Sequence, residues 1–106
     1  MTGLRATRDG AVVRLGWTPV ATVGCYDAVR GDPALLRSTA GDFGSAVSGC
    51  IENDDVDAAA WTPAAGTSEF YLVRASSLYC DQGSYDDGTE AAPRDAEIAH
   101  SAGACP

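Results

Sequence analysis

The chain has 106 residues and a formal net charge of −8, from 15 acidic residues and 7 arginines, with no lysine. This length suits one domain, so residues 1–106 are interpreted as a single unit. The negative charge repels phosphate backbones, and no apolar run approaches the roughly 20 residues of a membrane helix. We therefore expect neither nucleic-acid binding nor membrane insertion. The N-terminus lacks the apolar segment of a signal peptide, so we interpret the chain as a domain excised from a longer protein.

The first two predicted strands form a hairpin. "AVVRLGW" (11–17) alternates apolar and other residues with a period of two, which is typical of a half-buried strand. "GLRAT" (3–7) is a short strand before it, and Asp9-Gly10 is a strong hairpin turn. Pro19 ends the second strand.

"CYDAVRG" (25–31) is the next predicted strand. Its alternation places Tyr26 and Ala28 on the core face and Asp27 and Val29 on the other. The sequence Gly31-Asp32-Pro33 breaks the strand at its end.

The middle of the chain carries weaker signals. "ALLRSTAGDF" (34–43) is either a helical turn or a short edge strand. "GCIENDDVD" (49–57) is dense in acidic residues and glycine, and we expect a solvated loop stapled by a disulfide. "VDAAAW" (56–61) is a weak strand candidate because alanine is a poor strand former.

The last third contains the clearest strand. "EFYLVRAS" (69–76) is rich in aromatic and branched residues, with Tyr71, Val73 and Ala75 on one face. "GSYDDG" (83–88) begins a final strand. In the tail, 93–106, "RDAEIA" forms a helical turn that tucks in Ile98, and Cys105 anchors its end. Six or seven short strands separated by turns predict an all-β antiparallel sandwich of about seven strands.

Three stretches resemble the fibronectin type III-like (immunoglobulin-like) sandwich: "LGWTPV" (15–20), "YDAVRGD" (26–32) and "FYLVRASS" (70–77). The resemblance implies that Trp17 is the buried tryptophan of the second strand. It also implies that Tyr71 is the tyrosine corner, with its hydroxyl bonded to nearby backbone.

A narrower resemblance, strongest in "FYLVRA" and the closing "RDAEIA…ACP", is to a bacterial subgroup of these modules found in large secreted and surface proteins. It implies a non-catalytic spacer or binding unit.

The four cysteines, at wide spacing and without a CxxC pair, indicate two structural disulfides and an oxidising compartment, secreted or at the cell surface. In the resembled topology the start of 25–31 lies beside the end of 69–76. We therefore predict the pairs Cys25–Cys80 and Cys50–Cys105, of the three pairings that four cysteines allow. Cys25 departs from the subgroup's pattern.

Calcium is the one cofactor kept as an alternative. Asn53, Asp54, Asp55 and Asp57 offer oxygen ligands, which a loop at a sandwich end could complete with Asp32 or Asp42. "CDQGSYDDG", with Asp81, Asp86 and Asp87, is a second candidate. We favour the interpretation that these are ordinary turn residues and that no cofactor binds.

Aromatic residues suggest a second kind of site. Trp61, Tyr79 and Tyr85 could form a platform for sugar or peptide, although we favour Trp61 in the core with the tyrosines at its rim. His100 is the single histidine, in a tail without any nucleophile motif, and we expect no enzyme activity and no catalytic residues.

Three function hypotheses follow. The first is a non-catalytic extracellular module that serves as spacer or protein-interaction unit of a larger secreted or surface bacterial protein. The second is a self-associating surface or filament subunit. The third is a calcium-dependent adhesion or carbohydrate-binding module, whose partner would be a protein or glycan surface.

Overall fold

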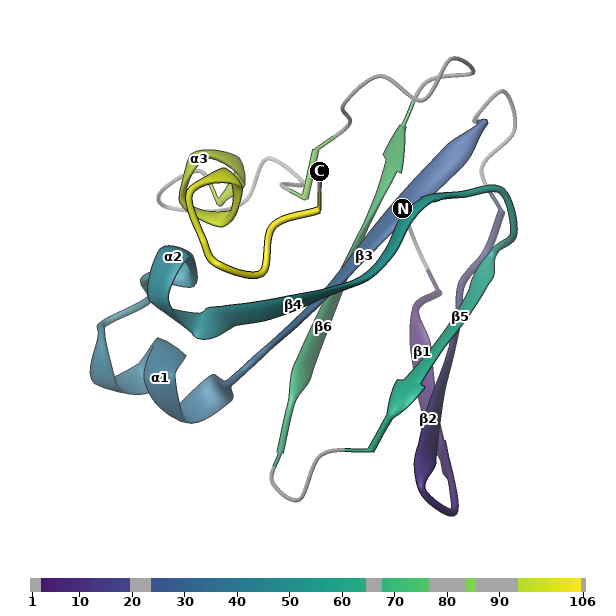
Figure 1. The fold of residues 1–106 in the computed structure, drawn as a ribbon, viewed down its shortest axis with the longest axis horizontal. Helices are drawn as coiled ribbons and strands as arrows, with labels where there is room; N and C mark the ends of the chain where they lie inside the picture. The colour runs from purple at the N-terminus through teal and green to yellow at the C-terminus, as the bar shows by residue number, and fades with distance from the viewer. Residues whose placement is uncertain (1–2, 20–23, 65–67, 77–83, 86–93, 106) are drawn as a thin grey trace.

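A computed structural model describes residues 3–19, 24–64, 68–76, 84–85 and 94–105. These residues form two three-stranded antiparallel sheets, with strand orders β1-β2-β5 and β4-β3-β6 (Figure 1). The expected antiparallel β architecture is therefore present as two sheets, with six strands in the described residues, and three short helices accompany them. The strands are β1 (Arg5–Asp9), β2 (Val12–Gly16), β3 (Cys25–Gly31), β4 (Val47–Asp55), β5 (Ala59–Pro63) and β6 (Phe70–Ser76).

The first sheet starts with the predicted hairpin. β1 and β2 pair in register around Asp9 and Gly10, and Gly10 has a φ of 62°, which glycine adopts at low cost in a tight turn. The period-two pattern of β2 turns Leu15 inward and Arg14 outward. β5 then pairs antiparallel with the other edge of β2.

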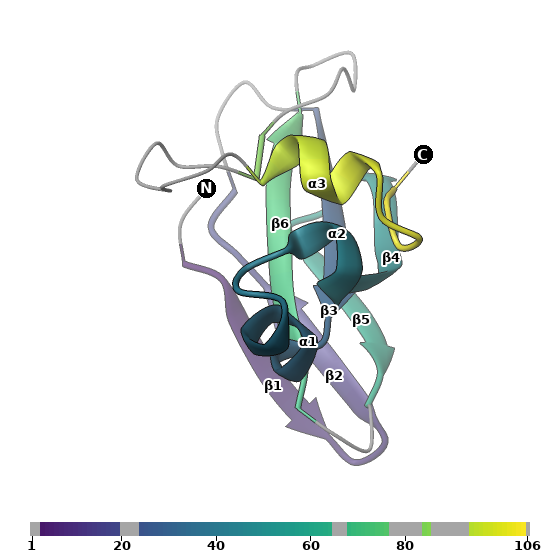
Figure 2. The same cartoon turned by 90° about the vertical axis from the view of Figure 1, so that its left-hand side faces the viewer.

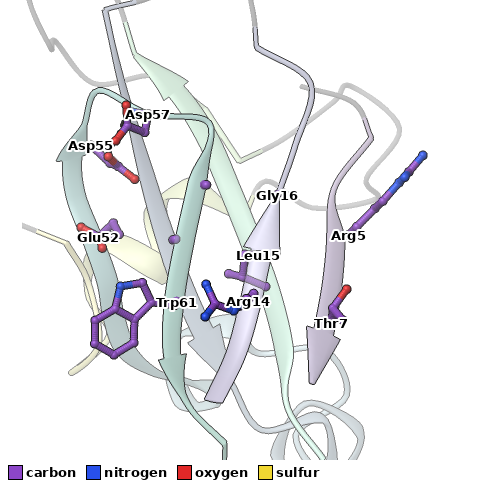
Figure 3. Close-up of a pocket in the computed structure, with 11 residues that line it drawn as sticks. Arg5, Thr7, Arg14, Leu15, Gly16, Glu52, Asp55, Asp57 and Trp61 are labelled. Atoms are coloured by element: carbon purple, nitrogen blue, oxygen red, sulfur yellow. Dashed lines mark hydrogen bonds between the residues drawn. The ribbon is translucent and has the colours of Figure 1, made fainter. Parts of the chain in front are cut away.

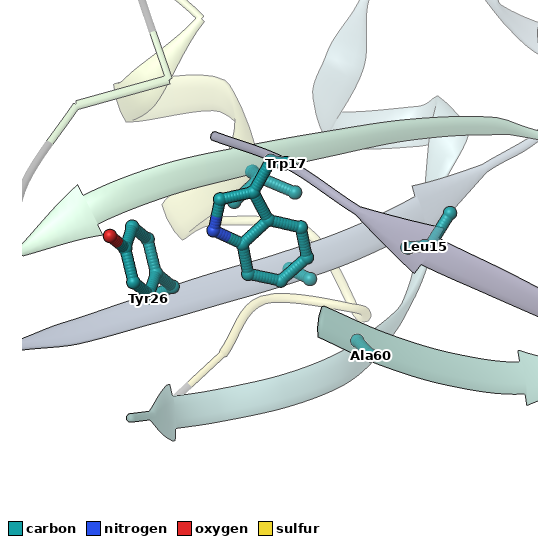
Figure 4. Close-up of a cluster of buried hydrophobic side chains, with 6 residues drawn as sticks. Leu15, Trp17, Tyr26 and Ala60 are labelled. Atoms are coloured by element: carbon teal, nitrogen blue, oxygen red, sulfur yellow. The ribbon is translucent and has the colours of Figure 1, made fainter. Parts of the chain in front are cut away.

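The core between the sheets is a cluster of buried side chains (Figure 4). Trp17 is 6% exposed, as predicted, and its ring meets that of Tyr26 edge-on at 5.4 Å between centroids. Ala28 and Val73 reach this cluster from β3 and β6. Tyr71 and Ala75 pack against the same cluster, which confirms the predicted face of β6.

β3 is the central strand of the second sheet and is buried on both faces. Ala28 faces the first core, whereas Val29 belongs to a second cluster on the opposite face, and both are 0% exposed. The alternation predicts that Ala28 and Val29 lie on opposite faces, but the second core that buries Val29 is not predicted. β3 pairs in continuous register with β6 along its whole length.

The prediction of a solvated loop at 49–57 is wrong for most of that stretch. Val47–Asp55 forms β4, an edge strand paired with β3 through several register shifts. An edge strand tolerates polar side chains because its exposed residues need not pack in a core, and register irregularities are common there. Asp54 adopts a φ of 56°, a conformation that Asp takes more readily than most residues.

Two short helices connect β3 to β4, so the helical alternative for 34–43 holds rather than the edge strand. α1 (Pro33–Ser38) and α2 (Phe43–Ala46) each begin after an aspartate. The Asp32 and Asp42 carboxylates accept hydrogen bonds from Ala34 N at 2.8 Å and Gly44 N at 2.9 Å. Both aspartates therefore serve as helix N-caps.

The C-terminal tail, in its described residues 94–105, packs on the outer face of the second sheet. α3 (Asp95–Ala99) lies beside α2 over β3 and β6 (Figure 2). Ile98, 2% exposed, packs with Val29 and Val47. Cys105 forms a disulfide with Cys50 of β4, the pair predicted from topology, and so anchors the tail to the sheet.

Several expectations fall outside the described residues. Cys80 of the predicted Cys25–Cys80 pair lies outside them, and Cys25 is buried at the start of β3. The final strand expected from 83–88 falls mostly there too, and its two described residues, 84 and 85, are not in a strand. No helix in the described ranges is long and apolar enough to cross a membrane.

Candidate functional site

A groove of about 680 Å³ runs over the first sheet at the side where β5 approaches β4 (Figure 3). The groove contains one aromatic side chain, two arginines and three carboxylates. Its lining is Arg5, Thr7, Arg14, Leu15, Gly16, Glu52, Asp55, Asp57, Ala59, Ala60 and Trp61.

Trp61 is the main apolar surface of this groove. Ala60 and Thr62, its neighbours on β5, are buried, so the alternation of the strand turns the indole outward and leaves Trp61 62% exposed. The preferred interpretation that Trp61 packs in the core is therefore wrong. Trp61 pairs directly with Arg14 of β2, which also faces out.

Three carboxylates lie on the β4 side of the groove. Glu52 and Asp55 come from β4, and Asp57 follows in the turn to β5. Asp55 Oδ1 accepts a hydrogen bond from Asp57 N at 3.0 Å, whereas Asp55 Oδ2 is buried without a hydrogen-bond partner. No arginine of the described residues forms an ion pair with any of the three.

The positive charge of the groove is smaller than its two arginines suggest. Arg14 Nε lies 3.5 Å from Asp9 Oδ2, so its charge already has an acidic neighbour. Arg5 extends away from the other labelled side chains in Figure 3. Three carboxylates against two arginines leave the lining of the groove with a formal charge of −1.

The four calcium candidates do not converge. No group of three or more potential ligands that could hold a metal ion occurs among the described residues. Asp54 donates its backbone N–H to Asp27 Oδ1 at 2.8 Å, and only Asp55 and Asp57 of the four line the groove. Asp32 and Asp42, the proposed additional ligands, are occupied as helix caps. The second candidate set, Asp81, Asp86 and Asp87, lies outside the described residues.

The aromatic platform considered as an alternative is not formed by Trp61 and Tyr85, the two of its three residues that the structure describes. Tyr85 is 6% exposed and belongs to the second core cluster under the tail, whereas Trp61 lies on the outer face of the first sheet. Tyr79 lies outside the described residues. Trp61 is therefore the aromatic residue of this set that is placed to meet a ligand.

Tyr71 differs from the tyrosine corner that the resemblance implies. Its hydroxyl donates to the Glu69 carboxylate at 3.4 Å, rather than to nearby backbone. Partial burial, followed by the charge of Glu69, raises the pKa of the Tyr71 hydroxyl above its usual value. This tyrosine tethers the start of β6 through a side-chain contact.

A buried polar cluster lies on the other side of the second sheet. Arg74 Nε is 2.7 Å from Asp27 Oδ2, and its guanidinium stacks over the Tyr85 ring at 4.8 Å from the centroid. Burial raises the pKa of Tyr85 to about 12. This pair is not among the predicted site residues, although antiparallel pairing of 25–31 with 69–76 places Asp27 opposite Arg74.

His100 follows the last residue of α3 as its C-cap and contacts the backbone of the same helix. Its ring Nδ1 lies 2.8 Å from Ala96 O, and the residue is exposed. The expectation that the chain is not an enzyme remains a prediction. The groove has the features of a binding surface: an exposed aromatic ring beside charged side chains.

Comparisons with known proteins give no match: no family model, no curated protein and no solved structure is significantly similar to the chain. The resemblance to fibronectin type III-like modules therefore stays a prediction.

Proposed function

We propose that this chain is a non-catalytic module of a larger secreted or surface bacterial protein, and that it acts as a protein-interaction unit through the groove that carries Trp61. The observation on which this proposal depends is the exposure of Trp61, 62%, in a groove of about 680 Å³. Tryptophan is among the residues that most often dominate binding energy at interfaces. A ring of this size on the outer face of a sheet has no packing role within the described sandwich.

The architecture supports a module of this kind. The first, second and fifth strands form one sheet and the third, fourth and sixth form the other, an arrangement compatible with an immunoglobulin-like sandwich in which the fourth strand joins the second sheet. The Cys50–Cys105 disulfide supports an oxidising compartment, because such bonds persist mainly outside the cytosol.

Self-association is less well supported than a different partner. The chain carries a net charge of −8, so two copies repel each other at low ionic strength. Light scattering of concentrated protein tests this alternative directly. A single monomeric species would support the interaction module, and growth into larger assemblies would favour the filament subunit instead.

The proposal is tested by selecting peptides from a displayed random library against the oxidised protein. Each binder is then titrated against the Trp61→Ala and Leu35→Ala variants. Leu35 is also an exposed large apolar residue, 42% exposed, but lies on α1, so it is the matched control. We expect binding to weaken at least about fivefold in Trp61→Ala and to stay unchanged in Leu35→Ala.

Two outcomes contradict the proposal. One is that every selected peptide binds Trp61→Ala as well as the unmodified protein. The other is that the groove retains only sugars on a glycan array, which would make the chain a carbohydrate-binding module.

A further inference from the structure

The groove around Trp61 also indicates which chemistry its partner presents. We infer that the groove binds a cationic segment of a partner protein, in which an arginine or lysine side chain lies over the Trp61 ring. This inference deepens the proposed function and rests on it. The juxtaposition that leads to it is an exposed indole bordered by three carboxylates that form no ion pair with an arginine of the described residues.

The first step concerns the aromatic ring. Cations are attracted to the face of an aromatic ring, and tryptophan is the strongest partner for them. Figure 3 shows the Trp61 side chain between β4 and β5, on the side of the groove to which Glu52 also belongs. A guanidinium or ammonium group over this ring would therefore meet a carboxylate in the same groove.

The second step concerns unsatisfied charge. Glu52, Asp55 and Asp57 line the groove without an ion pair to any arginine in the described part of the chain. A partner's guanidinium would offer these carboxylates hydrogen-bond donors in a planar fork. Charge complementarity thus favours a cationic occupant.

The third step distinguishes a peptide from a metal ion. These carboxylates do not belong to any group of described residues able to hold one metal ion. They are spread from the β4 strand to the turn before β5, so they suit a chain whose charges are also spread out. The overall charge of −8 adds long-range attraction for a basic partner.

The probes are three fluorescein-labelled nonapeptides of alternating serine and a variable residue, which is arginine, citrulline or glutamate. Citrulline keeps the shape and most hydrogen bonds of arginine but is neutral. Their binding to the oxidised protein is measured by fluorescence polarisation at about 0.05 M and about 0.5 M salt, between which the screening length falls severalfold. We expect the arginine peptide to bind at least about tenfold more tightly than the other two at low salt, and to weaken as salt rises.

The protein variants locate the effect. Glu52→Gln/Asp57→Asn should weaken the arginine peptide at least about threefold, mainly by slowing association. The control is Asp54→Asn, which removes one negative charge from the strand that carries Glu52, at an exposed residue outside the groove, and it is compared with Glu52→Gln alone; asparagine tolerates the positive φ of that position. Trp61→Ala should weaken the arginine peptide as well, and Asp54→Asn should change its binding by less than about twofold.

The outcomes separate this inference from the proposed function. If library peptides bind in a Trp61-dependent way but the arginine peptide binds no better than citrulline, the protein-interaction module stands and the cationic partner is excluded. If the arginine peptide binds equally to Trp61→Ala and Asp54→Asn weakens it as much as the groove variants do, the attraction is diffuse charge and the inference is wrong. If no peptide depends on Trp61, both proposals fail.

Discussion

Arg74 and Asp27 form a buried ion pair between neighbouring strands, with 2.7 Å from Arg74 Nε to Asp27 Oδ2. Asp27 is 2% and Arg74 7% exposed. The other oxygen of Asp27 accepts the backbone N–H of Asp54, so one carboxylate connects all three strands of the second sheet. Removing one partner of such a pair leaves the other charge buried and uncompensated.

Asp27→Ala should therefore destabilise the protein by about 3–5 kcal/mol. The measurement is urea denaturation, with Asp9→Ala as control because the Asp9–Arg14 pair is exposed and should contribute less than about 1 kcal/mol. Asp27→Ala/Arg74→Met should be more stable than Asp27→Ala alone, because the unpaired charge is gone. If Asp27→Ala and Asp9→Ala lowered the free energy of unfolding equally, the buried pair would contribute no more to stability than the exposed one.

The raised pKa of Tyr85 predicts that the folded protein loses stability at high pH. Its pKa is raised to about 12, chiefly by burial, against about 10 for an exposed tyrosine. Below pH 10 the phenol is neutral in both states, so its contribution to stability is fully present. Between pH 10 and 12 the unfolded chain loses this proton and the folded protein keeps it, so stability falls as pH rises, by about 2–3 kcal/mol at the upper limit.

The Tyr85 prediction is checked by ultraviolet titration and by unfolding at pH 9 and 11.5. When the titration curve of Tyr85→Phe is subtracted from that of the unmodified protein, the difference should show one tyrosine that ionises near pH 12. The Tyr85 hydroxyl is buried without a hydrogen-bond partner, so Tyr85→Phe should cost little at pH 7 and should lessen the loss at pH 11.5. Titration of Tyr85 near pH 10 would contradict its burial under the tail.

The sequence predicts those parts of the fold that depend on alternation. Leu15 on β2, Trp17 just after β2, and Val73 on β6 are buried in the positions that a period of two requires. Ile98 is recognisable because it is the one large apolar side chain in its helical turn. In each of these cases the local pattern and the burial of the side chain agree.

The failures share a physical cause, which is that tertiary context overrides residue type. "ENDD" resembles a loop, but β3 needs a partner at its edge, and an edge strand accepts polar residues. Trp61 resembles a core residue, but Ala60 and Thr62 occupy the inward positions of β5. The alternation of Ala60, Trp61 and Thr62 predicts an outward-facing indole, but the hydrophobic character of tryptophan favoured the interpretation as a core residue. The candidate groove, which joins residues of β1, β2, β4 and β5, could not be assembled without the sheet order.

The Cys50–Cys105 disulfide should supply much of the stability of the tail. It links residues 55 positions apart, and closing a loop of that size contributes about 4 kcal/mol on the chain-entropy model. Cys50→Ser/Cys105→Ser should lower the free energy of unfolding by that order, measured by urea denaturation. Amide hydrogen exchange in α3 should accelerate more than in β3, because the tail loses its covalent anchor. Uniform acceleration across both elements would mean that the tail and the sandwich unfold as one unit.

Gly103 should tolerate no side chain. It is buried where the tail crosses β4, and a Cβ there would collide with the backbone of Ser48 and Gly49. Backbone atoms cannot move aside cheaply, so Gly103→Ala should destabilise by about 1–3 kcal/mol. Ala102→Ser, at the exposed neighbouring position, is the control and should change stability by less than about 0.5 kcal/mol. An unchanged denaturation midpoint in Gly103→Ala would contradict the close packing of the tail on β4.

Calcium should not stabilise the protein through Asn53, Asp54, Asp55 and Asp57. These residues do not form a group able to hold a metal in the described structure, and Asp54 lies outside the groove that Asp55 and Asp57 line. We expect thermal melts in excess calcium and in excess chelator to coincide. A cation bound only by the folded state would stabilise it by about 2.7 kcal/mol at one hundred times its dissociation constant, which shifts the midpoint by several degrees. Such a shift, if Asp55→Asn/Asp57→Asn abolished it, would assign the carboxylates of the groove to a metal and remove the argument for a cationic peptide.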